Sequence, residues 1–255
     1  MLLTIIDSSS NVTLLLVALS LVVAGVMKGT LGVGMPIIAL PMVSMLIDVR
    51  GAVMLLSMPL ILSNIPQALQ GGGTFDCLVR LLPVIFGMMP GILVGVIVLF
   101  KYDPATTQTI AGVAVMTVAT LTLMAPKLTM SDRLLLPAGM VAGFLGGILG
   151  GVAAMSGPLV YTFLLAKGLR GKDFIKEASL FLVLSSALLA FFLSTSSAFD
   201  WRDTAISMAA LAPVACGMMF GQQLRERIPA ETFQKIVLII VMASGAGLVV
   251  KGHFT

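Results

Sequence analysis

Ten apolar segments follow one another along this chain of 255 residues, with only short polar stretches between them. Most of them reach the ~20 residues that a membrane-spanning helix requires. Only 10% of the residues are charged, whereas a soluble protein usually carries about a quarter. The sequence therefore predicts an all-α polytopic membrane protein, with about eight to ten transmembrane helices and no separate soluble domain. The segments span residues 12–27, 34–47, 51–69, 80–100, 107–125, 133–150, 157–167, 177–194, 204–221 and 232–250.

Two segments, 34–47 and 157–167, are short for a membrane crossing. Each could be a half-helix, a re-entrant element or the far part of a broken span. If all ten segments cross and the N-terminus is outside, eleven Lys and Arg side chains lie inside and four outside. If the two short segments are re-entrant, the split is ten to five. Both arrangements satisfy the positive-inside rule, and we expect an inner-membrane protein with its N-terminus outside.

Lys28 is the only ionisable side chain between Ser8 and Ile47, and glycines surround it at positions 25, 29, 32 and 34. Glycines at this density interrupt a helix, and Pro36 suits the first turn of a new one. A broken helix exposes backbone N–H groups at a positive dipole end, where anions bind. The alternative is that Lys28 reaches the membrane surface and the glycines only pack helices.

The chain contains an internal repeat. Residues 25–32 match 143–150 at an offset of 118, and positions between 36 and 64 match positions between 158 and 186 at an offset of 122. Residues 83–91 match 213–221 at an offset of 130, with six identities in nine positions. The sequence therefore predicts two homologous halves of five segments each, residues 1–126 and 127–255. We expect the repeated Pro-Val-x-x-Gly-Met-Met-x-Gly stretch to serve helix packing rather than substrate contact.

Corresponding loops of the two halves differ in charge. The stretch Lys167–Lys176 contains four cations, whereas its counterpart near Asp48–Arg50 contains one cation and one acid. Parallel halves would place such loops on the same side of the membrane and favour similar charge, whereas inverted halves place them on opposite sides. The contrast favours an inverted repeat.

In inverted-repeat carriers the substrate lies near the repeat interface, at broken helices. The two glycine-rich breaks are therefore the predicted substrate site, and the third segment of each half adds polar side chains at helical spacing. Those side chains could instead only link helices through hydrogen bonds. The candidate substrate-binding residues are Lys28, Gly29, Gly32 and Gly34 at the first break, Gly150, Gly151, Ser156 and Gly157 at the second, and Asn64, Gln67, Ser185 and Ser186 on the third segments.

Several classes of function find no support in the sequence. The only histidine is His253, near the end of the chain, and Cys77 and Cys216 are too few and too unlike in context for a metal site or disulfide. The sequence lacks a phosphate-binding loop, a zinc-protease motif and paired acids within the segments. We therefore expect no enzyme activity, no metal and no cofactor. The net charge of +4 is distributed as a topology signal, so nucleic acid is not an expected partner.

The two breaks read G-x-x-K-G-x-x-G-x-G at Gly25–Gly34 and G-x-x-G-G-x-x-G…S-G-P at Gly143–Pro158. In these motifs, and in length and duplication, essentially the whole chain resembles the sulfite exporter TauE/SafE family, also called the 4-toluene sulfonate uptake permeases. The resemblance implies a secondary carrier for sulfite, sulfoacetate or another organosulfonate. The chain departs from the usual pattern at Met35 and at Ala153–Met155, which leaves the substrate open.

Two alternatives stay open at this point. A passive anion channel would share the same features without coupling to an ion gradient. A non-sulfur organic anion, such as a carboxylate, would suit the same backbone amides and lysine. The expected partners are a small anionic substrate and the lipid bilayer, while the direction of transport, the coupling ion and a homodimeric assembly are not decided by the sequence.

Overall fold

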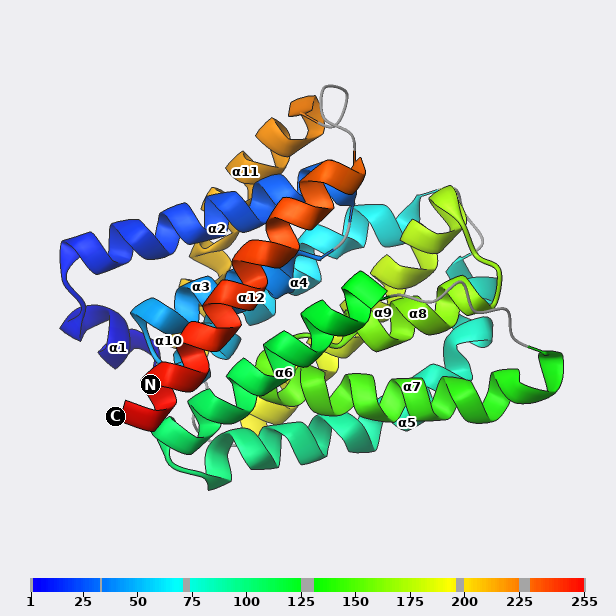
Figure 1. Ribbon diagram of the computed structural model, residues 1–255, viewed down its shortest axis with the longest axis horizontal. Coiled ribbons are helices and arrows are strands. Elements are labelled where there is room, and N and C mark those ends of the chain that lie inside the picture. The colour runs from blue at the N-terminus through cyan, green and yellow to red at the C-terminus, as the bar shows by residue number, and fades with distance from the viewer. Residues whose placement is uncertain are drawn as a thin grey trace.

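The computed structural model describes residues 2–32, 34–70, 74–124, 131–195, 200–224 and 230–254. Within these ranges the chain is helical and contains no strand (Figure 1). The helices are α1 (Leu2–Ser8), α2 (Asn11–Leu31), α3 (Met35–Leu46), α4 (Val49–Leu69), α5 (Thr74–Lys101), α6 (Pro104–Met124), α7 (Asp132–Ala153), α8 (Gly157–Ala166), α9 (Gly171–Thr195), α10 (Trp201–Ala209), α11 (Leu211–Leu224) and α12 (Ala230–Phe254).

Every predicted apolar segment overlaps a helix, so the all-α prediction is confirmed. Two details differ. The short helix α1 precedes the first predicted segment, and the ninth segment consists of two helices, α10 and α11, that meet at Ala210. Six stretches of the described chain are long and apolar enough to cross a membrane: Asn11–Leu31, Val49–Leu69, Thr74–Lys101, Arg133–Ala153, Gly171–Thr195 and Trp201–Leu224. The layout with ten spans stays a prediction.

Side-chain caps fix where several helices begin. The Thr13 amide donates to the Ser10 hydroxyl at 3.2 Å at the start of α2, and the Gly51 amide donates to the Asp48 carboxylate at 2.9 Å at the start of α4. Asp200 and Asp203 form a capping box at the start of α10. These bonds satisfy N–H groups that the first helical turn leaves without partners. The bond from the Asp203 amide also lowers the pKa of the exposed Asp200 carboxyl.

The helices α3 and α8 fold back along the helices that precede them. A Cβ on Gly34 would lie 2.8 Å from the side chain of Met27, and a Cβ on Gly146 would lie 2.8 Å from the carbonyl oxygen of Ser156. At 1.5 Å per residue, α3 and α8 are about 18 and 15 Å long, shorter than the ~30 Å hydrocarbon core of a bilayer. Each break is therefore the tip of a helical hairpin, and neither short helix is long enough to cross a bilayer by itself.

The most extensive helix contacts join the two predicted halves. Helix α2 packs against α11, α5 against α7, α4 against α9, and α6 against α12. Figure 1 shows α5 and α7 side by side along one edge of the molecule, with α6 and α12 crossing its front. In each of these four pairs, one helix comes from residues 1–126 and the other from residues 127–255.

Glycines bring the backbones of α2 and α11 into direct contact. A Cβ on Gly25 would lie closer than 3.0 Å to the carbonyl oxygen of Val214, and a Cβ on Gly29 would do the same with Met218. Small residues allow this approach in membrane proteins, where close packing and not the hydrophobic effect drives helix association.

The same contacts recur at the corresponding positions of α7 and α5. A Cβ on Gly143 would meet the carbonyl oxygen of Val84, and one on Gly147 would meet that of Met88. Gly143 and Gly147 correspond to Gly25 and Gly29 at the offset of 118. Val84 and Met88 correspond to Val214 and Met218 at the offset of 130. The repeated Pro-Val-x-x-Gly-Met-Met-x-Gly stretch forms the opposite surface in both pairs, so its predicted role in helix packing is confirmed, whereas for the glycines of the break motifs packing is the alternative interpretation. The reciprocal contacts follow the same correspondence, Gly217 with Val22 and Gly221 with Val26 in one pair, Gly87 with Met140 and Gly91 with Phe144 in the other.

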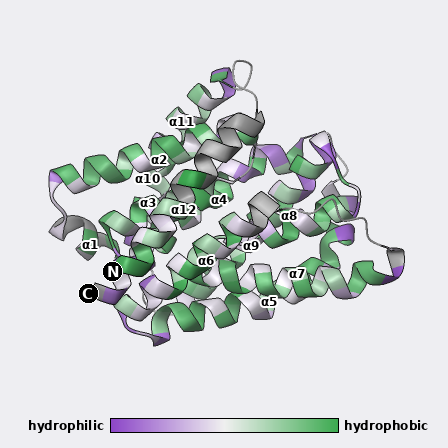
Figure 2. Ribbon diagram, in the orientation of Figure 1, coloured by the Kyte–Doolittle hydropathy of each residue, from purple (hydrophilic) through white to green (hydrophobic). Residues whose placement is uncertain are grey.

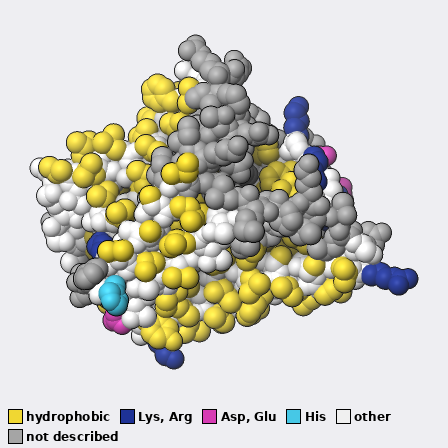
Figure 3. Space-filling view, viewed as in Figure 1, with side chains coloured by type: hydrophobic (Ala, Val, Ile, Leu, Met, Phe, Trp, Pro, Cys, Tyr) yellow, Lys and Arg dark blue, Asp and Glu magenta, His cyan; other side chains and the backbone are white. Residues whose placement is uncertain are grey.

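The exterior of the bundle is apolar along the lengths of the helices. Large hydrophobic side chains such as Phe86, Phe191 and Phe220 are exposed. Hydrophobic residues predominate along the ribbons in Figure 2, and Figure 3 shows them over the left and lower parts of the visible face, with most of the visible Lys and Arg side chains near its edges. An exposed apolar surface this extensive matches a lipid environment.

Candidate functional site

The first break takes its shape from two glycines in the left-handed region. Helix α2 ends at Leu31, and Gly32 (φ 81°) donates its N–H to the Lys28 carbonyl at 2.7 Å. Gly34 (φ 92°) precedes α3, which has Pro36 in its first turn. These two left-handed glycines, two positions apart, turn the chain sharply. Residues with a Cβ rarely adopt this backbone conformation. The break faces α4 and α9, because a Cβ on Gly32 would lie 3.8 Å from Gln67 Nε2 and 3.4 Å from Ile175.

The second break differs from the glycine loop that the sequence predicted between Gly150 and Gly157. Helix α7 continues through Gly150 and Gly151 to Ala153, and the break consists of residues 154–156. Ala154 (φ 53°) takes the left-handed position and donates to the Gly150 carbonyl at 2.9 Å. At the offset of 122, Ala154 is the counterpart of Gly32. Because the offset between the copies rises from 118 to 122 across the break, the second copy has four additional residues here. They add about one helical turn to α7 instead of lengthening the loop.

Lys28 is buried at the end of α2. Its side chain is 1% exposed, and Nζ donates a hydrogen bond to Oδ1 of Asn64 on α4. Asn64 Nδ2 donates to the Leu60 carbonyl at 2.6 Å, which fixes the amide with its oxygen toward Lys28. The alternative interpretation required Lys28 to reach the membrane surface, whereas its side chain is enclosed by the protein. Within the described part of the chain, no carboxylate forms an ion pair with this ammonium.

Buried hydroxyl groups surround the second break. Ser156 Oγ, at the break, hydrogen-bonds to Ser185 Oγ on α9, and the neighbouring Ser186 is also buried. A Cβ on Gly150 would lie closer than 3.0 Å to Ser156 Oγ, so glycine leaves the space that this hydroxyl occupies. The second half thus has neutral hydroxyl groups where the first half has a cation and an amide.

Helices α4 and α9 pack against each other and carry polar side chains near both breaks. Ser179 Oγ on α9 donates to Gln67 Oε1 on α4 at 3.2 Å, beside Gly32 of the first break. Ser63 Oγ on α4 is buried and has no hydrogen-bond partner among the described residues. The third segments of both halves therefore contribute polar groups to one region between the breaks.

The predicted residues fall into distinct environments. Lys28 and Asn64 form one pair, Ser156 and Ser185 form a second, and Gln67 lies beside Gly32. The other glycines serve packing: Gly29 contacts α11, Gly151 contacts the backbone of α5, and a Cβ on Gly157 would lie 2.5 Å from the ring of Tyr161. All the polar members are buried except Gln67, so the candidate site is closed to solvent in this conformation.

Sequence reasoning missed an ion pair between the halves. Arg80 Nε on α5 donates to Glu177 Oε1 on α9 at 2.6 Å. In the sequence, Arg80 begins the apolar segment 80–100 and Glu177 begins the segment 177–194, and neither position indicates the other. The internal repeat could not reveal the pair, because a repeat shows which positions of the two halves correspond and not which positions are in contact.

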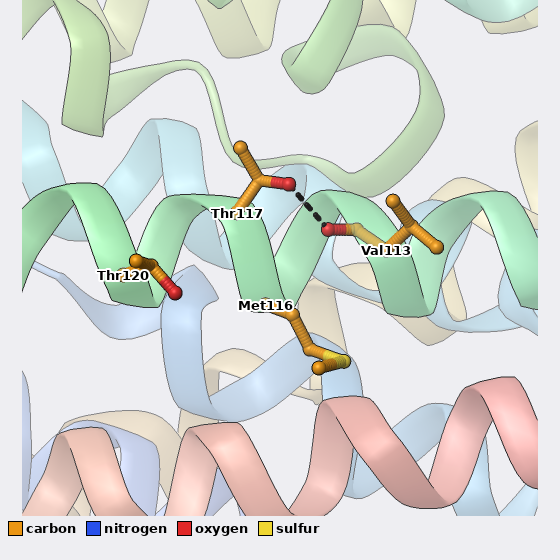
Figure 4. Close-up of a pocket in the computed structure, with 4 residues that line it drawn as sticks. All are labelled: Val113, Met116, Thr117 and Thr120. Atoms are coloured by element: carbon orange, nitrogen blue, oxygen red, sulfur yellow. Dashed lines mark hydrogen bonds between the residues drawn. The ribbon is translucent and has the colours of Figure 1, made fainter.

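A pocket of about 360 Å³ lies on α6. Figure 4 shows its lining residues, Val113, Met116, Thr117 and Thr120, with the Thr117 hydroxyl bonded to the Val113 carbonyl within the same helix. None of the predicted site residues lines it. The described residues also contain no group of three or more His, Cys, Asp or Glu side chains that could hold a metal ion.

Comparison with known proteins agrees with the motifs at the breaks. The family model described as Sulfite exporter TauE/SafE matches residues 17–248, which include both breaks and all the helix pairs described above except the ends of α12 and α2. No curated protein and no solved structure matches the chain. The match covers most of the chain, and the chain therefore belongs to the sulfite exporter TauE/SafE family of membrane transporters.

Proposed function

We propose that this chain is a secondary transporter that moves a small sulfur-containing anion, such as sulfite, sulfoacetate or another organosulfonate, across the inner membrane. The substrate binds between the two helix breaks, and its movement is coupled to an ion gradient. The observation that carries this proposal is the buried ammonium of Lys28, which bonds to a neutral amide and forms no ion pair within the described chain.

A buried cation without a counter-ion is costly. After relaxation, the effective penalty of removing one ion from water is several kcal/mol, and an ionisable side chain inside a membrane protein is a functional site by default. Asn64 supplies one acceptor, whereas an ammonium has three N–H donors. An oxyanion beside Lys28 would supply both the missing charge and further acceptors, which favours an anionic substrate.

Neutral donors near the breaks suit the remaining oxygens of such an anion. Ser156 and Ser185 offer hydroxyl groups, and Ser63 has a buried hydroxyl without a partner in the described structure. The first turns of α3 and α8 start at the breaks, where the positive end of each helix dipole favours an anion. A sulfonate group, like hydrogen sulfite, has three oxygens and a single negative charge, which one cation with several neutral donors matches.

The helix pairing supports alternating access by movement of two similar bodies. The α2–α11 and α5–α7 pairs make equivalent glycine contacts, and α4 and α9 run between them. We propose that the halves are inverted in the membrane, with the N-terminus outside and the basic stretch Lys167–Lys176 in the cytoplasm. Movement of one pair relative to the other would expose the region between the breaks to each side in turn.

The test is uptake of labelled sulfite, sulfoacetate and acetate into proteoliposomes, with and without a pH gradient. We expect gradient-dependent uptake of a sulfur anion by the wild type and at least a tenfold loss in Lys28→Gln. The exposed Lys101→Gln serves as the matched control and keeps its flux. Flux that ignores the gradient would favour a channel, acetate uptake equal to that of the sulfur anions would overturn the substrate class, and equal flux in Lys28→Gln would remove Lys28 from the site.

A further inference from the structure

The ion pair between Arg80 and Glu177 joins the two halves of the chain, and its two side chains differ in their exposure to solvent. Glu177 on α9 has a side chain that is 1% exposed, whereas that of Arg80 on α5 is 47% exposed. The carboxylate is therefore held inside the protein, while the guanidinium reaches the surface. If the pair separates, Arg80 can be hydrated where it stands, but Glu177 cannot.

The carboxylate of Glu177 is only half satisfied. Oε1 accepts from Arg80, whereas Oε2 is buried and has no hydrogen-bond partner among the described residues. An unpaired buried oxygen on a charged group is costly. Addition of a proton to Oε2 removes the charge and so removes most of this cost.

Other charged groups near the pair lie mainly on the side of Arg80. The guanidinium donates to Cys77 Sγ at 3.1 Å and lies within electrostatic reach of Asp76. Asp76 is exposed and can keep Arg80 paired after Glu177 is neutralised. The other titratable side chains of α9 and of the helices packed against it are Lys172, Asp173 and Lys176 on α9, Lys101 on α5, Tyr161 on α8, Arg50 on α4, and Asp132 and Arg133 on α7.

The pair is mechanically linked to the first helix break. Ile175, two residues before Glu177, lies against Gly32: a Cβ added to Gly32 would lie 3.4 Å from Ile175 Cδ1. Ser179, two residues after Glu177, bonds to Gln67, which also lies beside Gly32. A change in how α9 is held against α5 therefore acts directly on the wall of the proposed substrate site.

We propose that Glu177 is the binding site of the coupling proton, which adds at Oε2 and releases Arg80. The proposal rests on the proposed transport function. In the step, one proton from solution forms an O–H bond with the carboxylate, and no other covalent bond changes. Arg80 keeps its charge and turns toward Asp76 and water. Loss of the ion pair frees α9 from α5, and deprotonation restores the contact.

The first experiment separates coupling from transport. Proteoliposomes are assayed for sulfite accumulation driven by a pH gradient and for sulfite exchange at equal pH on both sides. We expect Glu177→Gln to lose at least tenfold in driven accumulation and to keep exchange within about threefold. Asp173→Asn, an exposed acid one turn earlier on the same helix, serves as the control and keeps both. Driven accumulation that persists in Glu177→Gln would overturn the assignment.

The second experiment does not depend on transport. Infrared spectra of the purified protein are recorded as the pH is lowered, and the band of a protonated carboxyl group is followed. The chain has eleven Asp and Glu side chains, so the spectra of the variants are compared with that of the wild type. We expect Glu177→Gln to remove a component at the high frequency of a buried carboxyl group, and Asp173→Asn to retain that component. A spectrum without this component in the wild type, or one that keeps it in Glu177→Gln, would overturn the proton site even if sulfite is transported, whereas the expected component without sulfite flux would overturn only the proposed function.

Discussion

The ammonium of Lys28 and the amide oxygen of Asn64 meet inside the protein, one at the end of α2 and the other on α4, where both side chains are buried. The amide is held in place by its own bond to the Leu60 carbonyl. A neutral partner leaves the positive charge of Lys28 uncompensated, and this is the condition that an anionic ligand can relieve.

Asn64→Asp should therefore stabilise the protein and stop transport. The new carboxylate lies against Lys28, forms an internal ion pair and takes the place of the substrate anion. We expect a higher midpoint of thermal unfolding in detergent and at least a tenfold lower flux of the sulfur anion. Asn11→Asp, exposed at the start of α2, is the control for added charge. Normal flux in Asn64→Asp would show that the anion does not approach Lys28.

Gly25→Ala and Gly143→Ala should destabilise the protein by similar amounts. In both, the new methyl group would meet a carbonyl oxygen of the partner helix, at Val214 in one pair and Val84 in the other. Overpacking of this kind typically costs about 1–3 kcal/mol, read here as a lower midpoint of thermal unfolding. Ala215→Leu, which adds bulk on an exposed face of α11, should have little effect. Unequal effects of the two glycine variants would contradict the equivalence of the two pairs.

The ion pair between the halves should show an asymmetric response to substitution. Arg80→Gln leaves a buried carboxylate without its cation, whereas Glu177→Gln leaves an arginine that already reaches the surface. We expect the first change to destabilise the protein more, by about 1–3 kcal/mol for a buried group left unsatisfied. Combining both substitutions should recover most of the loss. The measurement is a double-mutant cycle of thermal unfolding, and a double variant as unstable as Arg80→Gln alone would argue against the pair.

Gly32 and Ala154, the corresponding left-handed positions of the two breaks, should respond differently to exchange of glycine and alanine. Gly32→Ala forces a Cβ into a conformation that costs about 1–2 kcal/mol for L-residues. Ala154→Gly removes that strain but adds freedom to the unfolded chain, so its net effect should be small. Thermal unfolding of the two variants gives the comparison. If Gly32→Ala is as stable as the wild type, the first break does not have the left-handed geometry described for it.

Much of the helical framework could be predicted from the sequence. The apolar segments correspond to helices because a membrane-embedded chain must satisfy its backbone hydrogen bonds within each segment. The repeated Pro-Val-x-x-Gly-Met-Met-x-Gly stretch also indicated close packing, and the contacts of Gly87 and Gly217 agree with this. Lys28 stood out because it is the only ionisable residue in its segment, and its burial follows from the packing of α2 against α3 and α11 and from the bond to Asn64 on α4.

What could not be predicted is which surfaces meet. Nothing in the sequence indicates that Gly25 faces Val214 or that Arg80 reaches Glu177, because the offsets of a repeat relate copies and not contacts. The second break was placed too early, because glycine content suggested a loop at Gly150 and Gly151. Both remain helical, since packing against Ser156 and α5 uses the absence of a side chain rather than the flexibility of the backbone.

The pairing of α2 with α11 has a consequence for biosynthesis. The glycine face of α2 leaves the ribosome about 190 residues before its partner around Gly217. At roughly 5–20 residues per second, the delay is on the order of 10–40 s. During this time the small residues of α2 face lipid or the insertion machinery, so the helix that carries Lys28 can reach its final place only after α11 has entered the membrane.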